Sequence, residues 1–262
     1  KKTSLRLGAS KTYTLPQAKE ISPYRYVGVN FNSQGNPNLK PSDHYNLDLK
    51  WDFNPTPTEL ISLTAFYKLI KNPISRIEVA SAGGYLSYEN IADKATVAGV
   101  EVEIRKNLFV RPVSNAAHGM NKLSLGLNGS YIYTNAKMPL ATVTTGSQLE
   151  GAAPWIVNFD LSHNFTKGER SFVNTLVLNY VSDKIYTIGT QGYQDIMEQG
   201  VLTLDFVSQA KLNKHLSFNL KARNLLNSSY KLSRKANENG EKVILNDYKK
   251  GINISLGVSC TF

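Results

Sequence analysis

Residues 252–262, the last eleven of the chain, read INISLGVSCTF and decide the fold. Apolar and polar residues alternate without a break: Ile, Ile, Leu, Val, Cys and Phe fall on one parity, and Asn, Ser, Gly, Ser and Thr on the other. Successive side chains of a β-strand point to opposite faces. The stretch therefore predicts a strand that separates an apolar from a polar environment.

The same alternation recurs along the chain, for example in YNLDLKWDF (45–53), GVEVEIRKNL (99–108) and KLSLGLNGSYIYT (122–134). Apolar residues at the i, i+3, i+4 spacing of a helix do not persist anywhere, so we expect no helix. The sequence predicts an all-β protein of about ten strands. Their expected ranges are 3–10, 42–53, 59–71, 94–107, 121–134, 153–165, 170–183, 200–212, 215–226 and 249–262.

The connections between these strands alternate between short and long. The short ones are 54–58, 166–169 and 213–214, and the long ones are 11–41, 72–93, 135–152, 184–199 and 227–248. In an up-and-down antiparallel sheet, alternate connections lie at opposite ends. Short turns at one end and long loops at the other are typical of outer-membrane barrels. Residues 108–120 fit less well, because they belong to the short side and number thirteen.

Composition narrows the class further. The 262 residues carry a net charge of +10, with 30 Lys and Arg scattered along the chain rather than clustered as a nucleic-acid site requires. Mean hydropathy is −0.28 and no apolar run approaches about 18 residues, which excludes a transmembrane helix. One cysteine, Cys260, excludes an intrachain disulfide. No signal peptide is visible, so we expect either a removed leader or the back part of a longer precursor.

The apolar parity carries aromatic residues near the strand ends, and the polar parity carries charges in mid-strand. Tyr45, Tyr131 and Trp155 are examples of the first, and Asp48 and Asp160 of the second. Aromatic belts mark the membrane–water interface, and buried charges suit a wet interior better than a sandwich core. We therefore expect a transmembrane barrel with the apolar row toward lipid. A soluble β-protein is the alternative, although its strands average only about five to six residues.

Four motifs and the terminal aromatic residue carry a family resemblance. GNPNLKPS (35–42) is followed by FYKLIKNPI (66–74), AGVEVEI (98–104), RNLLNSSY (223–230) and the final Phe. In this order they resemble the C-terminal part of TonB-dependent outer-membrane receptors of the kind common in Bacteroidetes. The resemblance implies the outer membrane of a Gram-negative bacterium and a barrel of about 22 strands around an N-terminal plug domain.

On this interpretation residues 1–262 are the C-terminal part of one barrel domain, without a second domain and with the plug outside this chain. The resemblance implies several partners: outer-membrane lipid, the plug and earlier barrel strands, TonB through the plug, the barrel assembly machinery, a surface lipoprotein and a small-molecule ligand. It implies no nucleic acid. An independent ten-stranded barrel is the alternative.

The implied function is import of a scarce nutrient by TonB-dependent active transport. Binding and gating need no covalent chemistry, so we expect neither an enzyme nor a cofactor. An iron chelate is favoured over a corrinoid, and both over a glycan. A passive porin-like or structural barrel is the alternative. An omptin-like surface protease is more remote, because it needs Asp and His at the external rim, where only Asp43 and His44 occur. No histidine has a metal-binding spacing.

Two groups of candidate site residues follow. Glu101, Glu103 and Arg105 lie on the polar parity and, by the resemblance, would form a lumen wall that faces the plug. The alternative is hydrated wall charges paired across strands. Aromatic and Arg residues of the long loops would bind ligand by stacking and charge pairing, or would merely pack the loops. These are Tyr24, Tyr26, Arg76, Tyr85, Tyr88 and Tyr193.

Three further features are interpreted similarly. The last long loop carries Lys231, Arg234, Lys235 and Lys242, which would attract an anionic ligand or lipid phosphates, or would simply be solvated. The terminal Phe262 resembles the assembly signal of outer-membrane barrels. Cys260 is expected to be a small lipid-facing residue.

Overall fold

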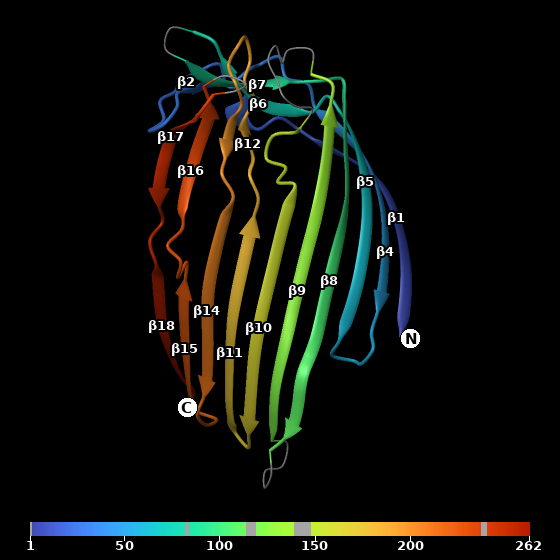
Figure 1. The fold of residues 1–262 in the computed structure, drawn as a ribbon, viewed down its shortest axis with the longest axis vertical. Coiled ribbons are helices and arrows are strands. Elements are labelled where there is room, and N and C mark those ends of the chain that lie inside the picture. The colour runs from blue at the N-terminus through green and yellow to red at the C-terminus, as the bar shows by residue number, and fades with distance from the viewer. Residues whose placement is uncertain (1, 82–83, 114–118, 139–147, 237–239) are drawn as a thin grey trace.

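The computed structural model describes residues 2–81, 84–113, 119–138, 148–236 and 240–262. Ten long strands form one antiparallel sheet in the order β1-β4-β5-β8-β9-β10-β11-β14-β15-β18 (Figure 1). β1 and β18 are its edges, so this part of a barrel is open. The strands are β1 Thr3–Thr14, β4 Ser42–Phe53, β5 Leu60–Lys71, β8 Lys94–Pro112, β9 Met120–Ala136, β10 Trp155–Lys167, β11 Arg170–Val181, β14 Val201–Lys211, β15 Leu216–Arg223 and β18 Asn253–Cys260.

The two side-chain rows predicted from alternation run across the sheet in register. One row joins Trp51, Leu63, Val102, Gly129 and Val157. The adjacent row contains polar residues: Asp52, Ser62, Glu103, Asn128 and Asn158. Since lipid contact requires apolar side chains, the first row faces the membrane and the second faces the barrel interior.

The ten predicted strands are confirmed, with four differences at their ends, one of which is that the strand expected at 215–226 ends at Arg223. β1 continues to Thr14. β8 and β9 extend into the connection expected at 108–120, past a register shift between Asn107 and Phe109, so that residues 108–112 and Met120 of this connection belong to strands. The expected strand 249–262 is wrong at its start, because Gly251 has φ = 79° and breaks the chain before β18.

The long connections fold into two small sheets at one end of the molecule, while the C-terminus lies at the other end (Figure 1). One sheet contains β2 Arg25–Tyr26, β3 Ser33–Gln34, β7 Tyr85–Asn90 and β6 Ile74–Val79. The other contains β12 Lys184–Thr187, β13 Ile196–Glu198, β16 Ser229–Lys235 and β17 Lys242–Lys249. We call these two sheets and the loops between them the cap.

The cap also contains a short helix, α1 Ala18–Ile21, which contradicts the expectation of no helix. Four residues are too few to show a helical period; a capping box at Gln17 and Glu20 holds the turn instead. Within the described ranges, no helix is long and apolar enough to cross a membrane.

The apolar core of the molecule lies in the cap. Ile77, Ile91, Leu149, Ile185 and Ile188 are almost completely buried and pack together. These residues come from three different long connections. Burying them holds the loops together, whereas the long strands leave their apolar row at the surface.

The motif GNPNLKPS joins the first long connection, in which it lies, to the second. A Cβ on Gly35 would lie 2.5–2.6 Å from backbone atoms of Lys19 and Ser22, so only glycine fits. The Asn36 side chain donates to the Tyr88 carbonyl at 3.0 Å and accepts from the Asn38 N–H at 3.0 Å. The motif therefore anchors the first connection to α1 and β7.

RNLLNSSY forms a comparable junction at the sheet. Asn224 and Asn227 adopt left-handed φ values of 55° and 46°. The Asn224 N–H donates to Asp205 and its side-chain amide donates to the Gly251 carbonyl, both at 2.8 Å. The motif thus holds the ends of β14, β15 and β18 together where the chain leaves the sheet.

Gly35→Ala tests the first junction. The added methyl group overlaps backbone atoms of the α1 turn, so the first connection should open more easily, by about 1–3 kcal/mol. Trypsin cleavage after the exposed Arg25 should accelerate by at least about fivefold. Gly8→Ala is the matched control, since its Cβ meets nothing within 4 Å. Equal cleavage rates in the two variants would contradict the assignment.

Candidate functional site

Arg76 and Glu150 form the first charged cluster of the cap. The Arg76 guanidinium donates to Glu150 Oε1 from Nη2 at 2.8 Å and from Nε at 3.2 Å, and the Arg76 backbone N–H donates to Oε2. The same guanidinium lies 4.0 Å from the centre of the Tyr186 ring. Three different connections meet here, because Arg76 lies on β6, Glu150 precedes β10 and Tyr186 lies on β12.

Glu78 and Arg234 form the second cluster. Their side chains are largely buried and make an ion pair between β6 and β16. The Arg234 guanidinium also lies 5.2 Å from the centre of the Tyr193 ring. The nearby Asp195 carboxylate accepts the Gly189 N–H at 2.8 Å.

Backbone hydrogen bonds hold the two clusters in one unit. Ile77 and Ile188 form a parallel bridge between the second and fourth long connections. The Ile188 N–H donates to the Arg76 carbonyl and the Glu78 N–H donates to the Ile188 carbonyl, both at 3.0 Å. The cap is therefore closed by paired backbone as well as by side chains.

Burial sets the electrostatics of the carboxylates. It raises the pKa of Glu150 above the ordinary 4.5, against the opposing effect of the Arg76 N–H bonds and charge. It likewise raises the pKa of Asp195 above 3.8, opposed by the Gly189 N–H and by Arg234. Protonation of either acid is thus easier in the closed cap than in water.

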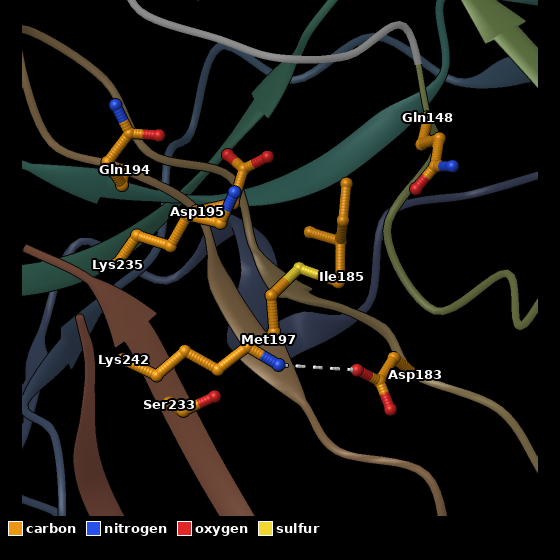
Figure 2. Close-up of a pocket in the computed structure, with 9 residues that line it drawn as sticks. All are labelled: Gln148, Asp183, Ile185, Gln194, Asp195, Met197, Ser233, Lys235 and Lys242. Atoms are coloured by element: carbon orange, nitrogen blue, oxygen red, sulfur yellow. Dashed lines mark ion pairs between the residues drawn. The ribbon is translucent and has the colours of Figure 1, made fainter. Parts of the chain in front are cut away.

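A cavity of about 290 Å³ opens beside the second cluster (Figure 2). Its lining combines two lysines, two aspartates, amide groups and an apolar patch: Gln148, Asp183, Ile185, Gln194, Asp195, Met197, Ser233, Lys235 and Lys242. Lys242 Nζ lies 3.9 Å from Asp183 Oδ2. Lys235 and Lys242 are direct partners across β16 and β17, an arrangement of like charges that an anionic group would stabilise.

Comparison with known proteins gives the family. The family model "TonB dependent receptor-like, beta-barrel" matches residues 1–225. The chain belongs to the TonB-dependent receptor family. It is 25% identical over 208 residues to the "Iron-regulated outer membrane virulence protein" of Vibrio cholerae, which covers 76% of this chain and 29% of that protein.

Solved structures with the same fold are also receptors and transporters. The copper transporter OprC aligns with a TM-score of 0.64 at 14% identity, over 99% of this chain and 37% of OprC. The R480A mutant of the ferric enterobactin receptor PfeA of Pseudomonas aeruginosa aligns with a TM-score of 0.59 at 17% identity, over 100% of this chain and 39% of PfeA. The ferric yersiniabactin uptake receptor FyuA of Yersinia pestis aligns with a TM-score of 0.55 at 16% identity, over 99% of this chain and 34% of FyuA. The chain thus spans about a third of these relatives.

The receptor barrel is an integral outer-membrane structure, as predicted. Its relatives are receptors and transporters rather than enzymes. The link to Bacteroidetes stays a prediction. Within the described parts of the chain, no group of three or more His, Cys, Asp or Glu residues could hold a metal ion.

The six predicted loop residues of the receptor are spread over the cap. Arg76 pairs with Glu150, and Tyr88 is its cross-strand partner on β7. Tyr193 lies beside Arg234. Tyr24 is exposed; Tyr26 contacts Lys19 at 5.7 Å and Tyr85 contacts Arg25 at 5.1 Å, measured to the ring centres.

None of the six lines the cavity of Figure 2. Of the four basic residues predicted in the last loop, Lys235 and Lys242 line it, Arg234 is tied to Glu78, and Lys231 pairs with Asp247 at 3.5 Å. Sequence reasoning missed the acids and amides that complete the site. Glu150, Gln148 and Asp195 lie in aperiodic connections, where no pattern distinguishes them from solvated residues.

The predicted wall residues lie on the interior row of the sheet. Glu101 is opposite Thr64 and Ser130, and Glu103 is opposite Ser62 and Asn128. Glu103 pairs with Arg105 of its own strand at 2.7 Å, not with a base on the next strand. Their contact with a plug stays a prediction.

Arg76→Leu tests the first cluster. The substitution removes the two guanidinium donors and the positive charge from the buried Glu150 carboxylate, which keeps only the backbone N–H of residue 76, so the cap should lose about 1–3 kcal/mol. Hydrogen exchange at the amides of 184–190 should accelerate at least about fivefold. Adding Glu150→Leu should restore much of the loss. Arg111→Leu, at the opposite end of the barrel, is the control. Equal protection of these amides from exchange in the Arg76→Leu and control variants would refute the role of Arg76 in holding the cap together.

The raised pKa of Glu150 predicts a pH dependence. An acid with a higher pKa in the closed cap than in opened loops favours closure when protonated. This contribution to the stability of the closed cap is complete below about pH 4.5, and it is lost as the pH rises through the raised pKa of Glu150. Exchange protection at 148–152, corrected for intrinsic rates, should therefore increase from pH 7.5 to pH 5. Glu150→Gln should reduce the dependence; weaker protection at pH 5 in the wild type is the contrary result.

Proposed function

We propose that this chain is the C-terminal part of a receptor that imports a scarce nutrient by TonB-dependent active transport, with an iron chelate as the favoured cargo. The observation that carries the proposal is the cavity in the closed cap of a TonB-dependent receptor barrel, which Lys235 and Lys242 line. The names of three relatives support iron: an iron-regulated protein, a ferric yersiniabactin receptor and a ferric enterobactin receptor. A copper transporter shares the fold, so another metal complex is the second candidate.

The chemistry of the cavity suits a chelate with acidic groups. Lys235 and Lys242 present two ammonium groups for carboxylate or phenolate oxygens. Gln148 and Gln194 offer amide donors, and Ile185 and Met197 offer an apolar surface. A few polar groups around an apolar patch are the usual make-up of a small-molecule site.

Gating follows from the position of this cavity in the cap. Two ion-pair clusters hold β6, β12 and β16 together. A bound chelate would add contacts to β16 and β17 on one side and to β12 and β13 on the other. We propose that binding stabilises the closed cap, and that rearrangement of a plug by TonB then releases the cargo inward.

The remaining partners belong to the same proposal. We place residues 1–262 in a single barrel domain whose wall residues Glu101, Glu103 and Arg105 face a plug. Phe262, which is fully exposed on the apolar parity, serves the barrel assembly machinery. A surface lipoprotein would act at the cap.

Growth and binding test the proposal together. A deletion strain should fail on one ferric chelate as sole iron source and still grow on cobalamin and glycans; failure on another class would reassign the cargo. The Lys235→Gln, Lys242→Gln double variant should bind that chelate at least about tenfold more weakly. Lys214→Gln, in a turn at the other end, is the control. Uptake that continues without TonB would show a passive barrel instead.

A further inference from the structure

A cationic surface lies on the outside of the barrel, away from the cavity. On the outward row, β4, β5, β8, β9 and β10 present mainly apolar and aromatic side chains in mid-strand, and His163 of β10 is the polar exception. One such row joins Leu49, Ala65, Val100, Tyr131 and Trp155. Toward the cap the composition changes abruptly. The last complete row joins Tyr13, Asp43, Lys71 and Lys94.

Four lysines gather at this rim. Lys71 and Lys94 are direct cross-strand partners. Lys11 lies one outward position lower, opposite Tyr45. Lys137 follows the end of β9 and lines an outward hollow of about 560 Å³ together with Lys94, Asp93 and Met138. We call Lys11, Lys71, Lys94 and Lys137 the rim lysines.

The rim lysines exceed the carboxylates around them. Lys11 Nζ lies 3.5 Å from Asp43, and Asp93 lines the hollow with Lys94 and Lys137. Two of the lysines also share one aromatic ring: Lys11 Nζ and Lys71 Nζ lie 5.4 Å and 5.3 Å from the centre of Tyr45. Four ammonium groups against two carboxylates leave a surface that complements negative charge.

Their depth places them at the lipid head groups. Tyr67 and Tyr133 form an aromatic row below them, flanking Ala98, and Tyr45 lies one outward position nearer the cap, opposite Leu69. Lys71 is four residues beyond Tyr67 on the same strand, about 13 Å along it. Since interfacial aromatics mark the edge of the hydrocarbon region, the rim lysines reach the phosphate level. The cap at this end consists of the long connections, so the leaflet is the outer one.

We propose that the rim lysines bind the phosphate groups of a phosphorylated glycolipid of the lipid A type in the outer leaflet. The apolar row beneath would contact its acyl chains while the ammonium groups pair with its phosphates. Lysines at the same depth on neighbouring strands give one lipid molecule several contacts at once. The inference rests on the outer-membrane location and not on the identity of the imported nutrient.

Native mass spectrometry of the protein purified from outer membranes tests this. Bisphosphorylated lipid A should remain bound, and enzymatically dephosphorylated lipid A should be retained at least about tenfold less. This comparison needs no mutation. Inorganic phosphate at equal concentration should displace none of the lipid, because it lacks the acyl chains. Equal retention of the two lipids would overturn the proposal.

Charge removal gives a second test. The Lys11→Gln, Lys71→Gln, Lys94→Gln variant should retain bisphosphorylated lipid A at least about tenfold less than the wild type. The control removes the same charge at the opposite end of the barrel, through Lys106→Gln, Lys167→Gln and Lys214→Gln. Its retention should equal that of the wild type. Equal losses in the two variants would show unspecific attraction and refute a site at the rim.

Discussion

Backbone hydrogen bonding in a medium without water is the constraint on which this structure depends. A strand in the hydrocarbon region must pair on both edges, and the ten long strands do so except at β1 and β18. Pairing in turn fixes the register, so every alternating strand contributes to the same two rows of side chains. One row becomes a lipid surface and the other an interior wall. The chemistry of the receptor is therefore confined to the interior row, the rim and the cap.

The cap is stabilised in a different way from the membrane strands, since its backbone is surrounded by water and its strands are short. There the stabilising elements are those of a soluble domain: an apolar core around Ile77 and Ile188, and buried ion pairs. Buried pairs contribute little net stability but specify one arrangement, because breaking either leaves an uncompensated charge. In the transport function that we propose, this property would suit loops that adopt one closed form and yet remain separable.

The strands could be predicted from the sequence because a period of two that persists over twelve residues matches a β-strand and no helix. The cap could not, since two-residue strands such as β2 and the four-residue α1 carry no period. The loop candidates show the same limit. Residue type singles out Arg76 and Tyr193, which do lie in the charged clusters, but it does not single out the acids Glu150 and Glu78. Which loops meet is decided by tertiary packing, and local sequence does not encode it.

The junction motifs connect the two environments. Asn90 donates to the carbonyls of Lys40 and Asn72 and so ties β4 to β5 where both leave the membrane. Lys71 is the last residue of β5, on the sheet side of this junction. Arg76 lies in β6, on the cap side. Charge on the lipid rim and charge in the cap are thus separated by one polar junction. Asn72 stands where the cap hairpin β6–β7 leaves β5, and its φ of 49° is one that few residues adopt. This conformation explains why asparagine stands between the membrane strand and the loop, since asparagine adopts left-handed φ values more readily than other residues with a side chain.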